Sequence, residues 1–346
     1  MNAPAPGHPD LLGFPKPGRS LRRLVGWLLV LLIFVFWWRS LQRLGVDWGR
    51  VLGTARGREA YLLLAAAGAA GYVVLQAVTW RAIVAGLGRA LPWVGCLRVW
   101  TTSNFARYLP GSMWHLVGRV YLGGEAGVSR ATGALSVLLE QGLQLLAAIL
   151  LVALTLPFWP PDTPVRRFAW LFAFVPLGLV AMYPRFFFPL LNHALRLLRR
   201  EPVPASLRYR DLLAYLGLYL VTHLSNALAL LFAVRALGAE WRTAPAVIGA
   251  GMVAWTIGVV SLLTPGGLGL REGLVTALLA PILGVDVAAV GALLWRAANI
   301  LTEALGVVLF NALSWVQARR LPPVPASWSA LPAGSGAAAT RTDEPS

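Results

Sequence analysis

Three long stretches of the chain contain no Asp, Glu, Lys or Arg, and they limit the possible folds more than any other feature. They cover Ala60–Trp80, Leu212–Val234 and Thr243–Leu270. Each is longer than the roughly 20 apolar residues that a helix needs to cross a bilayer. Since 58% of the 346 residues are hydrophobic and only 13% are charged, lipid must be part of the solvent around this chain.

The apolar runs are continuous rather than alternating, which predicts helices and not the strands of a β-barrel. The expected fold class is therefore an all-α polytopic membrane protein. No soluble catalytic domain is expected beside the membrane part. The full spans expected are 24–38, 60–80, 131–156, 168–191, 212–234 and 287–316.

Two further apolar stretches, 92–121 and 244–284, are each interrupted midway by a Pro-Gly pair. The first break contains Pro110 and Gly111, and the second contains Pro265, Gly266 and Gly267. Because Pro ends a helix and Gly permits a tight turn, we interpret both stretches as re-entrant helical hairpins. In each case two ordinary spans, or one kinked interfacial helix, are the alternatives.

Arginine bias predicts the orientation, because positively charged loops stay in the cytoplasm. Arginines cluster in 19–23, 192–211 and 319–320, which fall on one side if there are six spans. Both termini are then cytoplasmic, and the protein lies in the inner (cytoplasmic) cell membrane. The loop 39–59 is also rich in arginine and breaks the rule. The two hairpins enter from opposite sides, which makes an inverted repeat with its site near the bilayer midplane.

This topology divides the chain into three parts. They are a cytoplasmic segment (1–23), a transmembrane flippase-like domain (24–318) and a disordered tail (319–346) rich in Pro, Ala, Gly and Ser. The net charge of +16 is expected to meet anionic lipid head groups. No nucleic-acid module, cofactor motif or metal motif is apparent, and the single cysteine, Cys96, cannot form an intramolecular disulfide.

The residues around the breaks resemble a known family. The segment Thr264–Gly273 reads Thr-Pro-Gly-Gly-Leu-Gly-Leu-Arg-Glu-Gly, and Arg107–Arg119 carries a weaker Pro-Gly…Gly-x-Arg pattern. With Glu140 and Arg296, these motifs resemble the transmembrane flippase-type domain of the lysylphosphatidylglycerol synthase family, over residues 20–318. Full-length synthases carry a soluble aminoacyl transferase domain, which this chain is expected to lack. The resemblance therefore implies the translocating part, whose cargo is a lipid with a polar head group.

The chemistry of the breaks points to phosphate independently. Half-helices that start at Pro110–Gly111 and at Pro265–Gly267 present free backbone N–H groups and a positive dipole end. Arg119 and Arg271 follow the breaks and could add charge-assisted bonds to a phosphodiester. The alternative is that the glycines only make a turn, which Arg271 and Glu272 hold by pairing elsewhere.

Charges also lie inside the expected spans, where they must face protein or water. Ser136, Glu140 and Gln144 form one polar stripe at helical spacing, and Arg296, Asn299 and Glu303 form another. Glu140 and Arg296 follow their Pro-Gly breaks at nearly equal distances, so we expect them to pair, either along a transport path or as a structural ion pair.

Two further expectations concern packing. His223 is expected to be a packed, hydrogen-bonded core residue. The small-residue runs Gly68–Gly71 and Gly249–Gly251 are expected to allow close helix contact.

Three functions fit these features. The favoured one is a flippase or transporter, which moves a lipid between the leaflets. Its cargo would be a phospholipid, aminoacylated or not, or a lipid-linked sugar. The alternatives are a lipid-modifying enzyme that uses Glu140, Glu272 or Glu303 as acid or base, and an anchoring partner of a glycosyltransferase or lipid synthase. An enzyme is disfavoured because no nucleophile or metal cluster is evident. The expected substrate-binding residues are Arg107, Pro110, Gly111, Arg119, Glu140, Pro265, Gly266, Gly267, Arg271, Glu272, Arg296 and Glu303.

Overall fold

The computed structural model describes residues 35, 39, 42, 48–109, 113–161, 163, 166, 174–181, 183–197, 207–260 and 265–320, and all its elements are helices. The expected span 24–38 lies almost entirely outside these residues, as do 1–23, 321–346, Pro110 and Gly111. The orientation of the termini is therefore not described either.

Four helices in the described part of the chain are long and apolar enough to cross a membrane. They are α3 (Glu59–Gly86), α6 (Arg130–Thr155) with its 3-10 extension η2 (Leu156–Phe158), α9 (Tyr209–Ala236) and most of α12 (Val285–Arg320). They coincide with four of the six expected spans. Helix α12 also continues through Arg320, two residues into the range assigned to the tail.

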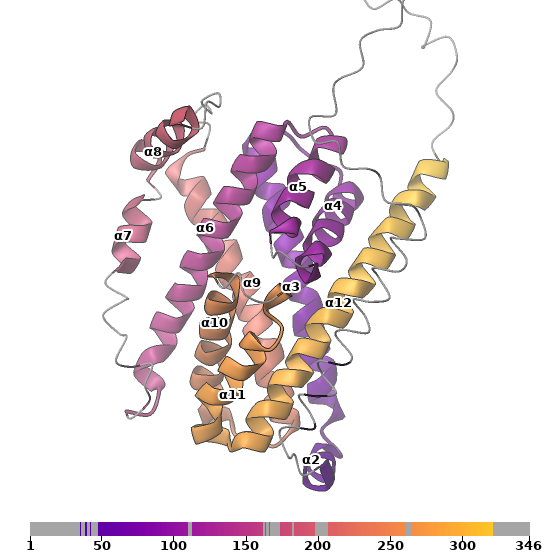
Figure 1. The fold of residues 1–346 in the computed structure, drawn as a ribbon, viewed down its shortest axis with the longest axis vertical. Helices are drawn as coiled ribbons and strands as arrows, with labels where there is room; N and C mark the ends of the chain where they lie inside the picture. Colours follow the sequence, from indigo (N-terminus) through magenta and orange to yellow (C-terminus); the bar gives the residue numbers. More distant parts are fainter. Residues whose placement is uncertain are drawn as a thin grey trace, which may run out of the picture.

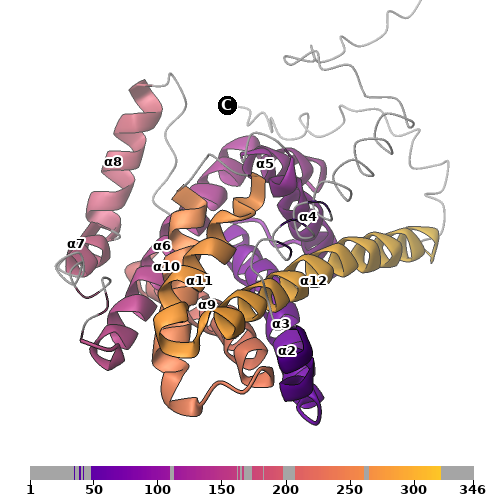
Figure 2. The same cartoon turned by 60° about the horizontal axis from the view of Figure 1, so that its bottom comes forward.

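The span expected over 168–191 is interrupted where the structure describes it. Helix α7 (Phe174–Ala181) ends, the chain bends at Tyr183, and α8 (Pro184–Leu197) begins. Pro184 explains the interruption, because proline lacks an N–H and disfavours helix in the residue before it. Both helices lie outside the bundle on the side of α6, with α2 (Trp48–Ala55) at another edge (Figure 2).

Each stretch that carries a Pro-Gly break forms a helical hairpin. The first consists of α4 (Trp93–Phe105), the 3-10 turn η1 (Ala106–Tyr108) and α5 (Trp114–Glu125). The second consists of α10 (Ala244–Val260), which follows the 3-10 turn η4 (Trp241–Thr243), then η5 (Pro265–Gly267) and α11 (Leu270–Leu283). These helices have 12 to 17 residues, fewer than the roughly 20 needed to span a bilayer.

The two hairpins enter the bundle from opposite ends (Figure 1). Their breaks meet inside it, where η1 contacts η5. The approach is so close that a Cβ atom on Gly266 would lie 2.8 Å from the ring of Tyr108. Gly266, Gly267 and Gly269 all have positive φ angles, which glycine adopts at little cost. The second break therefore requires glycine for its turn and for its contact with the first.

Helix α9 runs through the middle of the bundle and packs closely on α3. A Cβ atom on Gly68 would lie 3.0 Å from the carbonyl oxygen of Ser225, and the Ser225 hydroxyl donates to the Gly68 carbonyl at 2.8 Å. In α10, a Cβ atom on Gly251 would lie 3.1 Å from Leu230. The expectation that these small residues permit close helix packing is confirmed.

Candidate functional site

A cavity of about 340 Å³ lies where the two hairpins meet. Its walls come from α3, α4, η1, α5, α6, α10, η5 and the start of α11, so residues far apart in sequence share it. The charged side chains that line it are those of Arg107, Arg119, Glu140 and Arg271. All four belong to the expected substrate-binding set, and tertiary packing brings them together.

Arg119 and Glu140 form a buried ion pair between α5 and α6, and each is 1% exposed. One carboxylate oxygen of Glu140 contacts Arg119. The other accepts hydrogen bonds from the indole N–H of Trp100 and from the side-chain amide of Gln144, each at 3.2 Å. The guanidinium of Arg119 also lies 4.7 Å from the centre of the Trp100 ring. Both charges are therefore fully engaged by protein.

Glu272 and Arg296 form the corresponding pair between α11 and α12, with 3.1 Å from Nε to Oε1. Glu272 also accepts the backbone N–H of Gly269 at 2.7 Å, and Arg296 donates to the Gly266 carbonyl at 2.6 Å. This pair holds the glycine turn of the second break in place. The Glu272 carboxylate thus accepts a hydrogen bond from a backbone N–H at the start of α11. The sequence predicts that N–H groups at this end are free to bind phosphate.

The expected pair between Glu140 and Arg296 is wrong. Glu140 pairs with Arg119, and Arg296 pairs with Glu272. In each case the partner lies on the second helix of the hairpin that comes just before in the chain. The two positions still correspond, because each lies on the long helix that follows a hairpin. The hairpin contributes the arginine in the first half and the glutamate in the second half. Each of these charges is neutralised by a partner in the same half.

A third ion pair joins the two halves. Arg107 at the first break lies 3.6 Å from Glu303 on α12, measured from Nη1 to Oε1. The hydroxyl of Tyr108 donates to the other Glu303 oxygen at 2.9 Å. The guanidinium of Arg296 lies 5.5 Å from the centre of the Tyr108 ring. Tyr108 thus links both breaks to α12, and it was not among the expected site residues.

Arg271 is the exception among the charged residues of the site. It is 6% exposed, makes no ion pair with any residue of the described segments, and has an Nε without a hydrogen-bond partner. Two other arginines, Arg296 and Arg107, act on it by charge repulsion. A buried, unbalanced positive charge is costly for a protein to hold. The buried, unpaired charge of Arg271 at the cavity wall is consistent with a binding site for an anion.

Two glycines make the space that Arg271 occupies. A Cβ atom on Gly258 would lie 2.7 Å from its Cγ, and one on Gly267 would lie 2.8 Å from its Nε. Distances this short require the side chain to move.

We therefore predict that Gly258→Ala displaces Arg271 and lowers transport of an anionic cargo severalfold while the protein remains folded. Gly273→Ala is the matched control, because a Cβ atom there would meet nothing within 4 Å. Equal transport by the two variants, in vesicles with matched amounts of folded protein, would contradict this role of Gly258.

Two uncharged polar residues of the cavity, Asn104 and Gln76, were not among the expected site residues. Asn104 and Gln76 are each at most 2% exposed, and Asn104 Nδ2 and Gln76 Oε1 have no hydrogen-bond partner in the part of the chain that is described. The remaining amide group of Gln76 donates to Gln144 at 2.8 Å. Gln76 is a polar residue in the apolar run Ala60–Trp80, a signal that could have identified it.

His223 is packed as expected, but not hydrogen-bonded as expected. Its ring makes an edge contact with Trp255 at 4.4 Å between centroids, while neither ring nitrogen has a hydrogen-bond partner of normal geometry within the described ranges. Pro110 and Gly111 lie outside the described residues. Pro265 begins η5.

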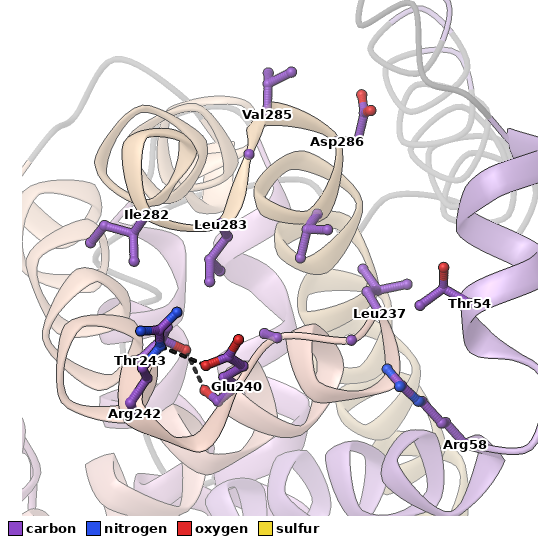
Figure 3. A pocket seen from close by; sticks show the side chains of 14 residues that line it. Thr54, Arg58, Leu237, Glu240, Arg242, Thr243, Ile282, Leu283, Val285 and Asp286 are labelled. Atoms are coloured by element: carbon purple, nitrogen blue, oxygen red, sulfur yellow. Dashed lines mark hydrogen bonds and ion pairs between the residues drawn. The ribbon is translucent and has the colours of Figure 1, made fainter.

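A second cavity, of about 430 Å³, lies at the end of the bundle where α9 leads into α10 and α11 turns into α12 (Figure 3). Arg58, Glu240, Arg242 and Asp286 line it. Arg242 and Glu240 pair with each other, and their side chains are 81% and 64% exposed. Water screens such charges, so the central cavity is the stronger candidate for specific binding.

Within the segments that the structure describes, no group of His, Cys, Asp and Glu side chains could hold a metal ion. Cys96 is buried, and its thiol donates to the Ala77 carbonyl at 3.4 Å.

Comparison with protein-family models identifies a family for the chain. The family model described as the lysylphosphatidylglycerol synthase TM region matches residues 19–306, which is most of the chain and includes both breaks and all the ion pairs of the site. No curated protein and no solved structure matches the chain.

Proposed function

The chain belongs to the lysylphosphatidylglycerol synthase TM family, and from this premise we propose that it moves a phosphate-bearing lipid between the two leaflets of the membrane. The observation that carries the proposal is Arg271, which is buried beside the central cavity with no acidic partner among the described residues. A guanidinium binds phosphate through charge-assisted hydrogen bonds, and such bonds are stronger where water is excluded.

The two hairpins support transport rather than simple binding. We interpret them as re-entrant, so that each reaches the middle of the membrane from one side and the cavity lies between their breaks. The cavity, at about 340 Å³, accommodates a polar head group, while the acyl chains remain in the bilayer. Small movements of one hairpin against the other would then open the cavity to either leaflet, as in transporters built from inverted repeats.

Leaflet exchange tests the proposal directly. The purified protein is reconstituted into vesicles that contain a trace of phospholipid with a fluorescent acyl chain, and a membrane-impermeant reductant quenches the outer leaflet. We expect the labelled lipid of the inner leaflet to be quenched much faster in vesicles that contain the protein than in empty vesicles. No exchange above empty vesicles for any phospholipid or lipid-linked sugar would contradict the proposal. It would favour the anchoring-partner hypothesis, which predicts a stoichiometric partner on purification.

We also propose that both termini are cytoplasmic in the inner membrane. The turn between α5 and α6 is then cytoplasmic, and the turn between α11 and α12 is outside. Glu125 and Val285 are exposed at these turns. In a Cys96→Ser background, Glu125→Cys and Val285→Cys should react with an impermeant thiol reagent from opposite sides of the membrane. Labelling of both from the same side would contradict the inverted repeat.

A further inference from the structure

We infer that the lipid head group carried by this protein has a net negative charge and bears uncharged hydroxyl groups, and that head groups with an ammonium group are discriminated against. This inference rests on the proposed function and narrows its cargo. It depends on three features of the central cavity: its net positive charge, the donors that already bind its carboxylate Glu140, and its buried polar atoms that have no hydrogen-bond partner in the described residues.

The charge balance of the cavity is positive. Arg107, Arg119 and Arg271 line it, with Glu140 as the acidic residue among its lining side chains. Glu140 neutralises Arg119, and Glu303, just behind the wall, neutralises Arg107. The charge of Arg271 remains. A head group with one phosphodiester and no other charge balances it, whereas a zwitterionic or cationic head group adds positive charge to a site that already holds an excess.

The carboxylates near the cavity are already bound to buried donors of the protein. Glu140 already contacts three donors, namely Arg119, Trp100 and Gln144. Glu303 holds Arg107 and Tyr108, and Glu272, outside the cavity wall, holds Arg296. An ammonium group would have to compete with a buried arginine for each of these carboxylates.

Aromatic rings could bind an ammonium group by a cation–π contact instead. The ring of Trp100 is already covered by the Arg119 guanidinium at 4.7 Å. Another cavity-lining ring, Trp255, contacts His223 and donates its indole N–H to Tyr72 at 3.2 Å. These rings are therefore engaged within the protein.

The unpartnered polar atoms fit an anionic polyol. Arg271 Nε and Asn104 Nδ2 are buried donors, and Gln76 Oε1 is a buried acceptor, and none has a partner in the described part of the chain. Phosphate oxygens accept from the two donors, and a hydroxyl group donates to Gln76. Because a buried polar group without a partner is costly, a ligand that satisfies all three gains both affinity and selectivity.

The test compares three lipids with identical labelled acyl chains in the leaflet-exchange assay: phosphatidylglycerol, phosphatidylethanolamine and lysylphosphatidylglycerol. We expect exchange of phosphatidylglycerol to be at least about tenfold faster than that of the other two, a difference of about 1.4 kcal/mol. Equal or faster exchange of either ammonium lipid would overturn the inference while leaving the proposed function standing.

A charge-adding variant tests the cause. Gln141 lines the cavity and is part-buried, so Gln141→Glu adds a carboxylate of nearly the same shape. This change should reduce the preference for phosphatidylglycerol severalfold, and by more than the neutral change Gln141→Met does. An unchanged preference in Gln141→Glu would contradict the charge argument.

A binding measurement separates failure of the inference from failure of the proposed function. Soluble glycerophosphoglycerol should raise the thermal unfolding temperature of the purified full chain more than glycerophosphoethanolamine does, and Arg271→Gln should remove the difference. If no lipid exchanges but this preference holds, the proposed function fails and the charge inference survives. If neither compound is preferred, the inference fails whatever the exchange assay shows.

Discussion

Arg271→Gln is expected to reduce lipid exchange by roughly tenfold to a hundredfold without lowering the yield of folded protein. A hydrogen bond to a charged group contributes about 1.5–3 kcal/mol, and the variant loses such a bond to the lipid phosphate. Arg271 is 6% exposed and without an acidic partner in the described segments, so its removal relieves an uncompensated buried charge. Stability should therefore be unchanged or higher.

The measurement is leaflet exchange in vesicles with matched amounts of folded protein, together with thermal unfolding in detergent. Arg130→Gln serves as the control, because Arg130 is an exposed residue at the start of α6, away from the cavity. Arg271→Lys should be intermediate, since lysine keeps the charge but cannot bind phosphate in the bidentate manner of arginine. Wild-type exchange rates in Arg271→Gln would refute the role of this residue.

Glu140→Gln is expected to have the largest effect on stability. It leaves the Arg119 guanidinium buried without its counter-ion, and breaking a buried pair in this way costs about 3–5 kcal/mol. Because proteins are stable by only about 5–15 kcal/mol, a large fraction of the variant should fail to fold. Arg119→Gln should be destabilising as well, and the double variant Arg119→Gln/Glu140→Gln should recover part of the loss, since neither charge is then left alone.

A second double variant provides the control. Glu140 and Arg296 do not pair with each other, so Glu140→Gln/Arg296→Gln should show additive loss of stability. Folded yield and the temperature of unfolding in detergent measure both cycles. Recovery in Glu140→Gln/Arg296→Gln, or additive loss in Arg119→Gln/Glu140→Gln, would mean that the ion pairs described above are not the ones that stabilise the protein.

The exchanged signs of the two ion pairs explain how two halves, each a hairpin followed by a long helix, can carry a site that is not symmetric. In the first half the arginine is on the hairpin and the carboxylate is on the long helix, and in the second half the order is reversed. Two neutral pairs result. The excess charge comes from the residue next to Glu272, namely Arg271, which has no acidic partner in the described segments. The unpaired positive charge therefore lies near the meeting point of the two halves, where we propose that the anion binds.

The apolar runs and the Pro-Gly breaks could be read directly from the sequence. Four expected spans appear as long helices, and both broken stretches appear as helical hairpins. These features are local: a run without charges must be helical in lipid because its backbone groups have no water to bond, and proline and glycine act on their own turn. The same reasoning was insufficient for 168–191, where a proline at the start of α8 outweighed the apolar composition.

The sequence also determined that the charges within the spans had to face protein or water, and the site residues predicted from it include the charged residues Arg107, Arg119, Glu140, Arg271, Glu272, Arg296 and Glu303. It could not determine which charges pair, because a long side chain on a helix can reach several neighbouring helices, and the periodicity of one helix does not say which neighbour it faces. Only the packing of α5 on α6 and of α11 on α12 decided that Glu140 meets Arg119 and that Arg296 meets Glu272. The same packing left Arg271 without an acidic partner in the described segments, and so made an arginine at a glycine turn into a candidate site for a lipid phosphate.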